Sequence, residues 1–220
     1  MKHACFLFLG ASLLAQELYL SPESFAVSPG ERVKVGISTA DLSRLKDASM
    51  YTTSGAYNML NLRRDGAGAA VDVAIKGPGT PVLAIRTLPS VSGGKRSTEF
   101  AKALLISGGK TDDAFKRRVG HALEFVPAQN PYSLKPGATL PVHLLLRGKP
   151  AAGVQVQAIH TVGETAEAED IGKTDSSGRI LVPLTVAARW RVAATVTEPC
   201  PEPTVAEAES FTASLAFEVK

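Results

Sequence analysis

Segments in which apolar and polar residues alternate recur along most of this chain. In residues 32–37, three β-branched residues alternate with charged or small ones, and residues 71–75 repeat the pattern. Successive side chains of a β-strand point to opposite faces, so a period of two places one face against a core and the other towards solvent. Clusters of Pro, Gly and Ser end these segments, as they commonly end strands. The sequence therefore predicts an all-β fold built from antiparallel strands.

One segment, residues 97–118, departs from this alternation. Phe100, Leu104 and Leu105 have the spacing of one helix face, and a Gly-Gly pair follows them where glycine commonly ends a helix. Acidic residues then precede basic ones in residues 111–118, which is the order that the helix dipole favours. We expect a short helical segment here.

The charge balance also changes at this segment. Residues 16–118 carry 15 basic and 10 acidic side chains, whereas residues 119–220 carry 8 basic and 11 acidic ones. Such an asymmetry between two halves of a chain favours separate domains. We therefore expect two antiparallel β-sandwich domains, an N-terminal one over residues 16–96 and a C-terminal one over residues 119–220, joined by the helical connector at residues 97–118.

The C-terminal part has the pattern of a Greek-key β-sandwich. Six strand-like segments follow one another, with turn signals about every ten residues. Asp175 and Gly178 mark one turn, because Asp caps its own backbone and Gly accepts a positive φ. Trp190, the single tryptophan, is expected to anchor the core. The acidic residues 164–170 and the Pro-rich residues 198–210 are expected to form exposed loops.

The first fifteen residues have the order of a secretory signal peptide. Lys2 and His3 precede an apolar run over residues 4–14, and the small residue Ala15 follows it. We expect cleavage after Ala15 and a mature protein that is periplasmic or secreted. The apolar run is too short to span a bilayer, and no later stretch approaches the length of a membrane helix. No membrane span is therefore expected after cleavage.

Cysteine usage fits an exported chain without an internal disulfide. Cys5 lies in the signal segment and would leave with it, so Cys200 would be the single cysteine of the mature chain. Cys200 lies between two prolines and has no His or second Cys near it in sequence with which to hold a metal. We expect a free, unreactive thiol in an exposed loop.

Known catalytic signatures are absent from the sequence. It has no GxSxG or HExxH motif, and its glycine-rich segments lack the spacing of a phosphate-binding P-loop. The formal net charge of +3 is too small to drive binding to nucleic acid, and few aromatic residues lie among the basic pairs. We therefore expect a protein that is not an enzyme and does not bind nucleic acid, with no catalytic or cofactor-binding residue.

Several segments together resemble one family. Residues 119–158, which contain LEFVPAQNP and LRGKPAAGVQVQA, residues 172–184 and the closing FTASLAFEV are similar to the NikM-like family of periplasmic domain-of-unknown-function proteins. The resemblance implies a transthyretin-like or carboxypeptidase-regulatory-like sandwich in the C-terminal domain, which is a statement about fold and not about reaction. It also implies an association with nickel uptake and, as a partner, a metal-uptake transporter or another envelope component.

The implied association makes three histidines, His121, His143 and His160, the candidate ligands of a transition metal. The sequence has no HxH, HxxH or CxxC spacing, so a site would need these residues to converge across strands that lie about 4.8 Å apart. We expect no tight site and at most weak binding of nickel. Calcium at the acidic residues 164–170 is an alternative, but without the pattern of a calcium loop they are expected to be solvated charges.

Two functions from different classes follow. The first is an exported, non-enzymatic binding or accessory protein associated with transition-metal (nickel) uptake. The alternative is an envelope structural or adhesion-type β-sandwich module without metal. Clustered histidine or carboxylate side chains would favour the first function, whereas an exposed apolar or aromatic face would favour the second.

Overall fold

The computed structural model describes residues 17–55, 57–65 and 68–220, and these residues contain no α-helix. They form strands and three short 3-10 turns, at Leu42–Arg44, Asp113–Lys116 and Pro131–Ser133. The all-β expectation is therefore confirmed. The predicted signal peptide over residues 1–15, with Cys5, lies outside the described residues. In the part of the chain that the structure describes, no helix is long and apolar enough to cross a membrane.

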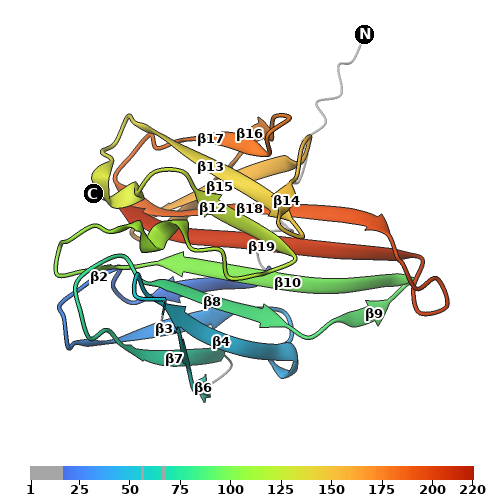
Figure 1. Ribbon diagram of the computed structural model, residues 1–220, viewed down its shortest axis with the longest axis horizontal. Helices are drawn as coiled ribbons and strands as arrows, with labels where there is room; N and C mark the ends of the chain where they lie inside the picture. Colours follow the sequence, from blue (N-terminus) through green and yellow to red (C-terminus); the bar gives the residue numbers. More distant parts are fainter. Residues whose placement is uncertain (1–16, 56, 66–67) are drawn as a thin grey trace, which may run out of the picture.

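A nine-stranded sheet, called the central sheet below, runs through the middle of the molecule (Figure 1). In spatial order its strands are β16 (Thr165–Lys173), β15 (Gln155–Val162), β18 (Ala188–Pro199), β19 (Ala208–Val219), β10 (Lys95–Leu104), β8 (Val82–Thr87), β4 (Leu45–Tyr51) and β5 (Tyr57–Met59), with β9 (Ser90–Ser92) paired to β10. Neighbouring strands are antiparallel except β10 and β19, which run parallel. The expectation of antiparallel strands throughout is therefore wrong at the centre of the sheet. Parallel pairing is possible there because most of the C-terminal half separates the two strands in sequence.

Two four-stranded sheets cover opposite faces of the central sheet, so the molecule has three layers (Figure 1). The upper sheet contains β12 (Leu123–Pro127), β13 (Thr139–Leu146), β14 (Lys149–Pro150) and β17 (Arg179–Pro183). The lower sheet contains β1 (Tyr19–Pro22), β3 (Arg32–Ser38), β7 (Gly68–Ala74) and β6 (Leu62–Asp65). The short strands β2 (Ala26–Val27) and β11 (Ile106–Ser107) form a separate parallel pair.

Each covering sheet encloses its own hydrophobic core against the central sheet. The upper core lies between the upper sheet and β15, β18, β19 and β10, and it includes Trp190, which is 3% exposed. The expectation that Trp190 is a core anchor is confirmed. The lower core lies between the lower sheet and β4, β8 and β10. Strand β10 serves both cores, because Phe100 and Leu104 belong to the upper one and Ala101 and Ala103 to the lower one.

The helical connector expected at residues 97–118 is wrong. Half of its apolar residues lie in strand β10. A single 3-10 turn follows later, in which Asp112 caps the N-terminus by accepting a hydrogen bond from Ala114 N at 3.1 Å. A strand buried on both faces reads as a continuous apolar run instead of an alternating one, and such a run also contains helical spacings. The two halves of the chain are therefore joined within the central sheet by strand pairing.

A buried ion pair fastens β10 to the upper sheet. The side chain of Lys102 is 1% exposed, and its Nζ donates hydrogen bonds to Glu124 Oε1 at 2.8 Å, to the Arg117 carbonyl at 2.9 Å and to the Phe125 carbonyl at 3.0 Å. Burial lowers the pKa of the Lys102 ammonium, and the Glu124 carboxylate opposes that effect. Because all three ammonium hydrogens have acceptors, this lysine has a structural role.

The acidic residues 164–170 lie largely in an edge strand, not in a loop as expected. They belong to β16 and the turn before it, and β16 pairs with β15 along one side only. Exposed edges commonly carry charged side chains, which discourage pairing with another chain. The alternation of Ala and Glu in this segment is therefore a strand pattern, with both faces exposed.

Candidate functional site

One half of the lower face of the central sheet is left open by the lower sheet. The lower core contains residues of β4, β8 and β10, one residue of β19, and none of β15, β16 or β18. Where this open half meets the edge strand β1, there is a groove of about 310 Å³. The residues that line this β1–β18 groove are Tyr19, Leu20, Ser21, Phe25, Ile159, Thr161, Ala166, Arg189, Trp190, Arg191 and Ala216.

Two arginines of β18, Arg189 and Arg191, line the groove because side chains alternate between the two faces of a strand. Trp190 and Val192 belong to the upper core, so Arg189 and Arg191 point to the opposite face of the central sheet. Strand β15 places Thr161 opposite Arg189, and next to Arg191 it places a buried isoleucine. This side of the groove therefore carries the guanidinium groups of Arg189 and Arg191 beside the apolar side chain of Ile159.

Strand β16 completes this wall with small residues. Ala166 pairs with Thr161, and Ala168 pairs with Ile159, so both alanines share the face that carries the groove. Glu167 pairs with His160 on the other face. The Ala-Glu alternation thus keeps Glu167 and Glu169 off the groove side, and Asp170, which pairs with Gln157, does not line the groove.

The polar groups beside the groove are incompletely paired. The Arg191 guanidinium lies 4.0 Å from the centre of the Tyr19 ring, yet its Nε is buried without a hydrogen-bond partner. Glu17 Oε2 is also buried without a partner. Arg189 lies over the Phe25 ring at 6.0 Å and donates through Nη2 to the Glu23 carbonyl at 2.9 Å. Buried polar atoms of folded proteins are mostly hydrogen-bonded, so these two unpaired atoms, whose side chains interact electrostatically, are exceptions to that rule.

The electrostatics of Glu17 and Arg191 depend on each other. Burial raises the pKa of the Glu17 carboxyl, the charge of Arg191 opposes the rise, and Glu99 adds to it. Burial also lowers the pKa of the Arg191 guanidinium, while Tyr19 and Glu17 raise it. Arginine keeps its charge in proteins. The groove therefore presents the Arg191 cation, and the carboxyl group of Glu17, which is costly to ionise, lies near enough to interact with it but outside the groove lining.

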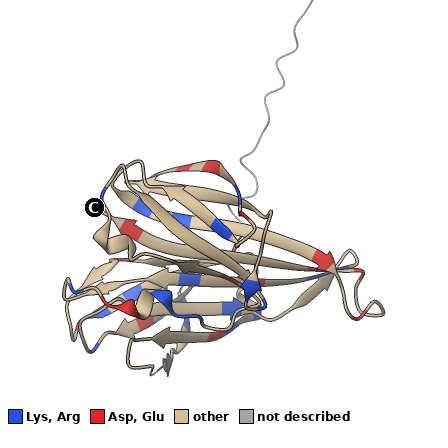
Figure 2. Cartoon of the chain, turned by 45° about the horizontal axis from the view of Figure 1, so that its top comes forward, with Lys and Arg blue, Asp and Glu red and all other residues tan. Residues whose placement is uncertain are grey.

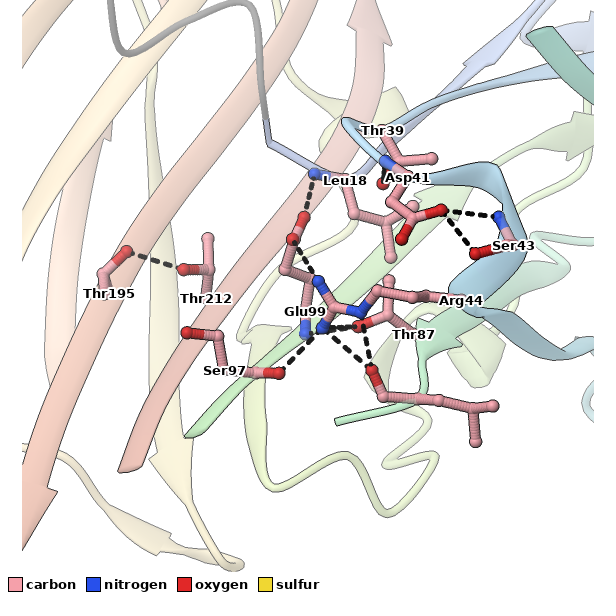
Figure 3. Close-up of polar contacts among 11 residues, drawn as sticks. Leu18, Thr39, Asp41, Ser43, Arg44, Thr87, Ser97, Glu99, Thr195 and Thr212 are labelled. Carbon is pink, nitrogen blue, oxygen red and sulfur yellow. Dashed lines mark hydrogen bonds and ion pairs between the residues drawn. The ribbon is translucent and has the colours of Figure 1, made fainter. Parts of the chain in front are cut away.

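A hydrogen-bond network holds the start of β1 in place (Figure 3). Leu18 N donates to Glu99 Oε2 at 2.7 Å, and Ser214 Oγ donates to the Leu18 carbonyl at 2.7 Å. Arg44 Nη1 lies 3.8 Å from Glu99 Oε1, and Arg44 Nη2 donates a hydrogen bond to the Ser97 carbonyl at 2.7 Å. Asp41 caps the turn that carries Arg44 by accepting from Ser43 N at 2.9 Å. The β1 wall of the groove is therefore fixed to β10 and β19.

The three predicted metal ligands occupy separate places. His121 precedes β12 instead of lying in a strand, with its ring 4.9 Å from that of Phe100, and burial together with the charges of Lys102 and Arg86 lowers its pKa to about 3. His143 lies in β13, paired with residues of β12 and β17. His160 lies in β15, 5.0 Å from the Trp190 ring. Among the described residues, no three His, Cys, Asp or Glu side chains are grouped so that they could hold a metal ion.

Cys200 lies in a loop but is not exposed as expected. Its side chain is buried, at 7% exposure, and Sγ lies 3.5 Å from the Glu202 carbonyl. The loop folds back so that Cys200 N donates to the Glu207 carbonyl at 3.0 Å. The prolines on either side restrict the backbone without forcing the side chain outwards.

The groove residues were missed by the sequence reasoning, although a signal for them exists. The sequence RWRV over residues 189–192 alternates Arg with Trp and Val, and this pattern in a strand predicts two arginines on the face opposite a core anchor. The β1 side of the groove comes from residues more than a hundred positions away, so no local pattern predicts it.

The described residues thus form a β-sandwich, and the β1–β18 groove lies at the open half of its central sheet. The chain belongs to the DUF4198 family, described as a domain of unknown function, whose profile matches residues 38–198. No curated protein matches the chain.

Solved structures with some similarity are distant. A DUF4785 family protein from Legionella pneumophila is 11% identical, with a TM-score of 0.34, and the match covers 80% of this chain and 52% of that one. The chain therefore spans about half the length of the Legionella structure. The D0-D1 domain of intimin is 16% identical, with a TM-score of 0.28 and coverage of 90% and 96%. Murine CEACAM1b is 9% identical, with a TM-score of 0.25 and coverage of 93% and 99%.

Proposed function

We propose that this protein is an exported, non-enzymatic binding protein that takes a small carboxylate-bearing molecule in the β1–β18 groove. The observation that carries the proposal is the pair of buried, unpartnered polar atoms, Arg191 Nε and Glu17 Oε2, beside a groove with an apolar floor. A buried polar atom without a partner costs about 1–3 kcal/mol, which a bound ligand would recover.

The groove offers a distinct contact to each part of such a ligand. A guanidinium is planar and pairs with a carboxylate through two parallel hydrogen bonds, and the Tyr19 ring stacked on Arg191 holds that plane in position. Arg189 supplies a second positive charge on the same face. Glu17 can accept a hydrogen bond from an amino or hydroxyl group of the ligand, and the apolar body would lie on Ile159 and Phe25. The volume of about 310 Å³ is at the lower end of small-molecule sites.

Calorimetric titration of the mature protein tests the proposal. The ligand panel pairs amino acids and hydroxy acids with their amides, which have the same body without the carboxylate. We expect binding of acids and not of amides, and at least a tenfold weaker affinity in Arg191→Gln, which is about 1.4 kcal/mol. The matched control is Arg179→Gln, an exposed arginine on β17 of the upper sheet. Equal binding of acids and amides, or equal losses in both variants, would contradict the proposal.

The association with nickel uptake remains a separate proposal that rests on the sequence resemblance. Its candidate ligands are the three histidines, and its candidate partner is a metal-uptake transporter or another envelope component. Titration of the mature protein with nickel, copper, zinc and calcium is the test. A one-to-one nickel complex of micromolar affinity that His143→Ala or His160→Ala abolishes would support a metal function. The envelope structural module remains the alternative if neither organic acids nor metals bind.

A further inference from the structure

A second concave region lies at the corner where the chain passes from β5 of the central sheet to β6 of the lower sheet. Three hollows adjoin there, with volumes of about 500, 380 and 240 Å³. The first and second share Met50, Asn58 and Lys76, and the second and third share Arg63 and Asp72. The hollows therefore form one continuous trough, called the corner trough below. It lies apart from the β1–β18 groove, with which it shares no lining residue.

One end of the corner trough is built around Asp112. Its Oδ1 accepts hydrogen bonds from Thr80 N at 3.0 Å, Thr80 Oγ1 at 2.6 Å and Ala114 N at 3.1 Å, and Oδ2 accepts from Thr53 Oγ1. A side chain at Gly79 would collide with the carboxylate, since an added Cβ would overlap Oδ2. Burial raises the pKa of Asp112, but these hydrogen bonds outweigh that effect and hold the pKa below its ordinary value. The carboxylate is therefore fixed and ionised, with acceptor capacity left on Oδ2.

Hydroxyl and amide groups accompany this carboxylate. Thr53, Ser54 and Asn58 line the first hollow together with Asp112, and all three are exposed. Carboxylate, hydroxyl and amide groups together can both accept and donate hydrogen bonds. Such a set matches a ligand that is rich in hydroxyl groups.

The other end of the corner trough is strongly basic, and blue Lys and Arg segments recur over the lower layer in Figure 2. Arg32, Arg63 and Lys76 line the second hollow, and two further cations, Lys34 and Arg64, line the third with Arg63. Asp72, which pairs with Arg63, is the single acidic residue among the described linings of these two hollows. Among the described lining residues, cations therefore outnumber carboxylates, and such an excess of positive charge attracts a ligand that carries several negative charges.

We propose that the corner trough binds an acidic oligosaccharide, with sugar hydroxyls on Asp112, Thr53 and Asn58 and the acidic groups on Arg32, Arg63 and Lys76. The proposal joins two observations, a hydroxyl-matching hollow and a basic one, which share Asn58 and Lys76. A flat lipid surface fits less well, because the hollows are concave and the first one is lined by fixed polar groups. An acidic glycan of the envelope would attach the protein there and leave the β1–β18 groove free.

Fluorescence anisotropy of the mature protein with labelled tetragalacturonic acid tests this proposal, and the fully methyl-esterified tetramer is the neutral counterpart. We expect the acid to bind with a marked dependence on salt and the ester to bind at least tenfold more weakly. The double variant Arg32→Ala/Lys76→Ala should lose at least tenfold in affinity for the acid, and Asn58→Ala should lose affinity for both acid and ester.

Control variants separate binding in the corner trough from general attraction between the glycan and the basic residues of the surface. The double variant Lys149→Ala/Arg179→Ala removes two cations of the upper sheet and should bind like the parent, and so should Arg191→Gln, which tests the other groove. Thermal unfolding by circular dichroism checks that each variant is folded. Equal binding of acid and ester, equal losses in the two double variants, or binding to phosphatidylglycerol vesicles without binding to the glycan would each overturn the proposal.

Discussion

The buried pair of Lys102 and Glu124 allows a sharp test of how the two halves of the chain are joined. In Lys102→Met the aliphatic part of the side chain is kept, but the Glu124 carboxylate loses its buried cation, and the Arg117 and Phe125 carbonyls lose a donor. Breaking a buried ion pair from one side typically costs about 3–5 kcal/mol. We expect a loss of that size in the free energy of unfolding, measured by urea titration and linear extrapolation.

Two further variants make this prediction refutable. In Lys102→Met/Glu124→Gln the buried charge is gone, while the glutamine oxygen can still accept from Val119 N, which lies 2.7 Å from Glu124 Oε1 in the parent. We expect the double variant to be more stable than the single one by about 2 kcal/mol. Lys116→Met breaks an exposed pair with Asp113 and should cost less than about 1 kcal/mol. A near-neutral Lys102→Met, or a double variant as unstable as the single one, would refute the reasoning.

Three other predictions follow from burial and sequence. Trp190→Ala should destabilise the protein by about 3–5 kcal/mol in urea titration, because Trp190 is 3% exposed in the upper core, and a near-neutral effect would contradict its role as an anchor. His121 has a folded-state pKa of about 3, below its ordinary value of 6.5, so the unfolded chain takes up the proton first. The contribution of neutral His121 to stability is complete above about pH 6.5 and should fall by about 1.4 kcal/mol per pH unit towards pH 3. The free energy of unfolding of the parent should therefore decrease more steeply over that range than that of His121→Phe. N-terminal sequencing of exported protein should begin at Gln16, and a chain that still begins at Met1 would contradict cleavage after Ala15.

The strands with one exposed face could be predicted from the sequence, because their alternation is visible in single segments. The run in residues 32–37 became β3, with Val33, Val35 and Ile37 buried as expected. Strand β10 could not be predicted in this way. Its two faces are buried in two different cores, so its sequence shows no alternation, and the resulting apolar run also fits a helix.

Contacts between distant segments explain the remaining differences. The parallel pairing of β10 with β19 joins residues 95–103 to residues 208–216, and nothing local in either segment specifies that partner. The β1–β18 groove has the same origin, since Tyr19 meets Arg191 across most of the chain. The three histidines have the chemistry of metal ligands, but the sequence does not specify their positions in the sheets, and the structure places them beside different neighbours.

The position of the groove follows from the different widths of the sheets. A sheet of nine strands is wider than either four-stranded sheet, so each covering sheet leaves part of one face open. On the upper face, Phe115 of the segment after β11 packs into the upper core with Val82 of β8, so this segment extends the cover beyond the upper sheet to β8. On the lower face, no described segment packs in the same way over β15 and β16. Solvent therefore reaches Arg189 and the exposed part of Arg191 from that side, and a sheet with one open half is suited to present a binding groove.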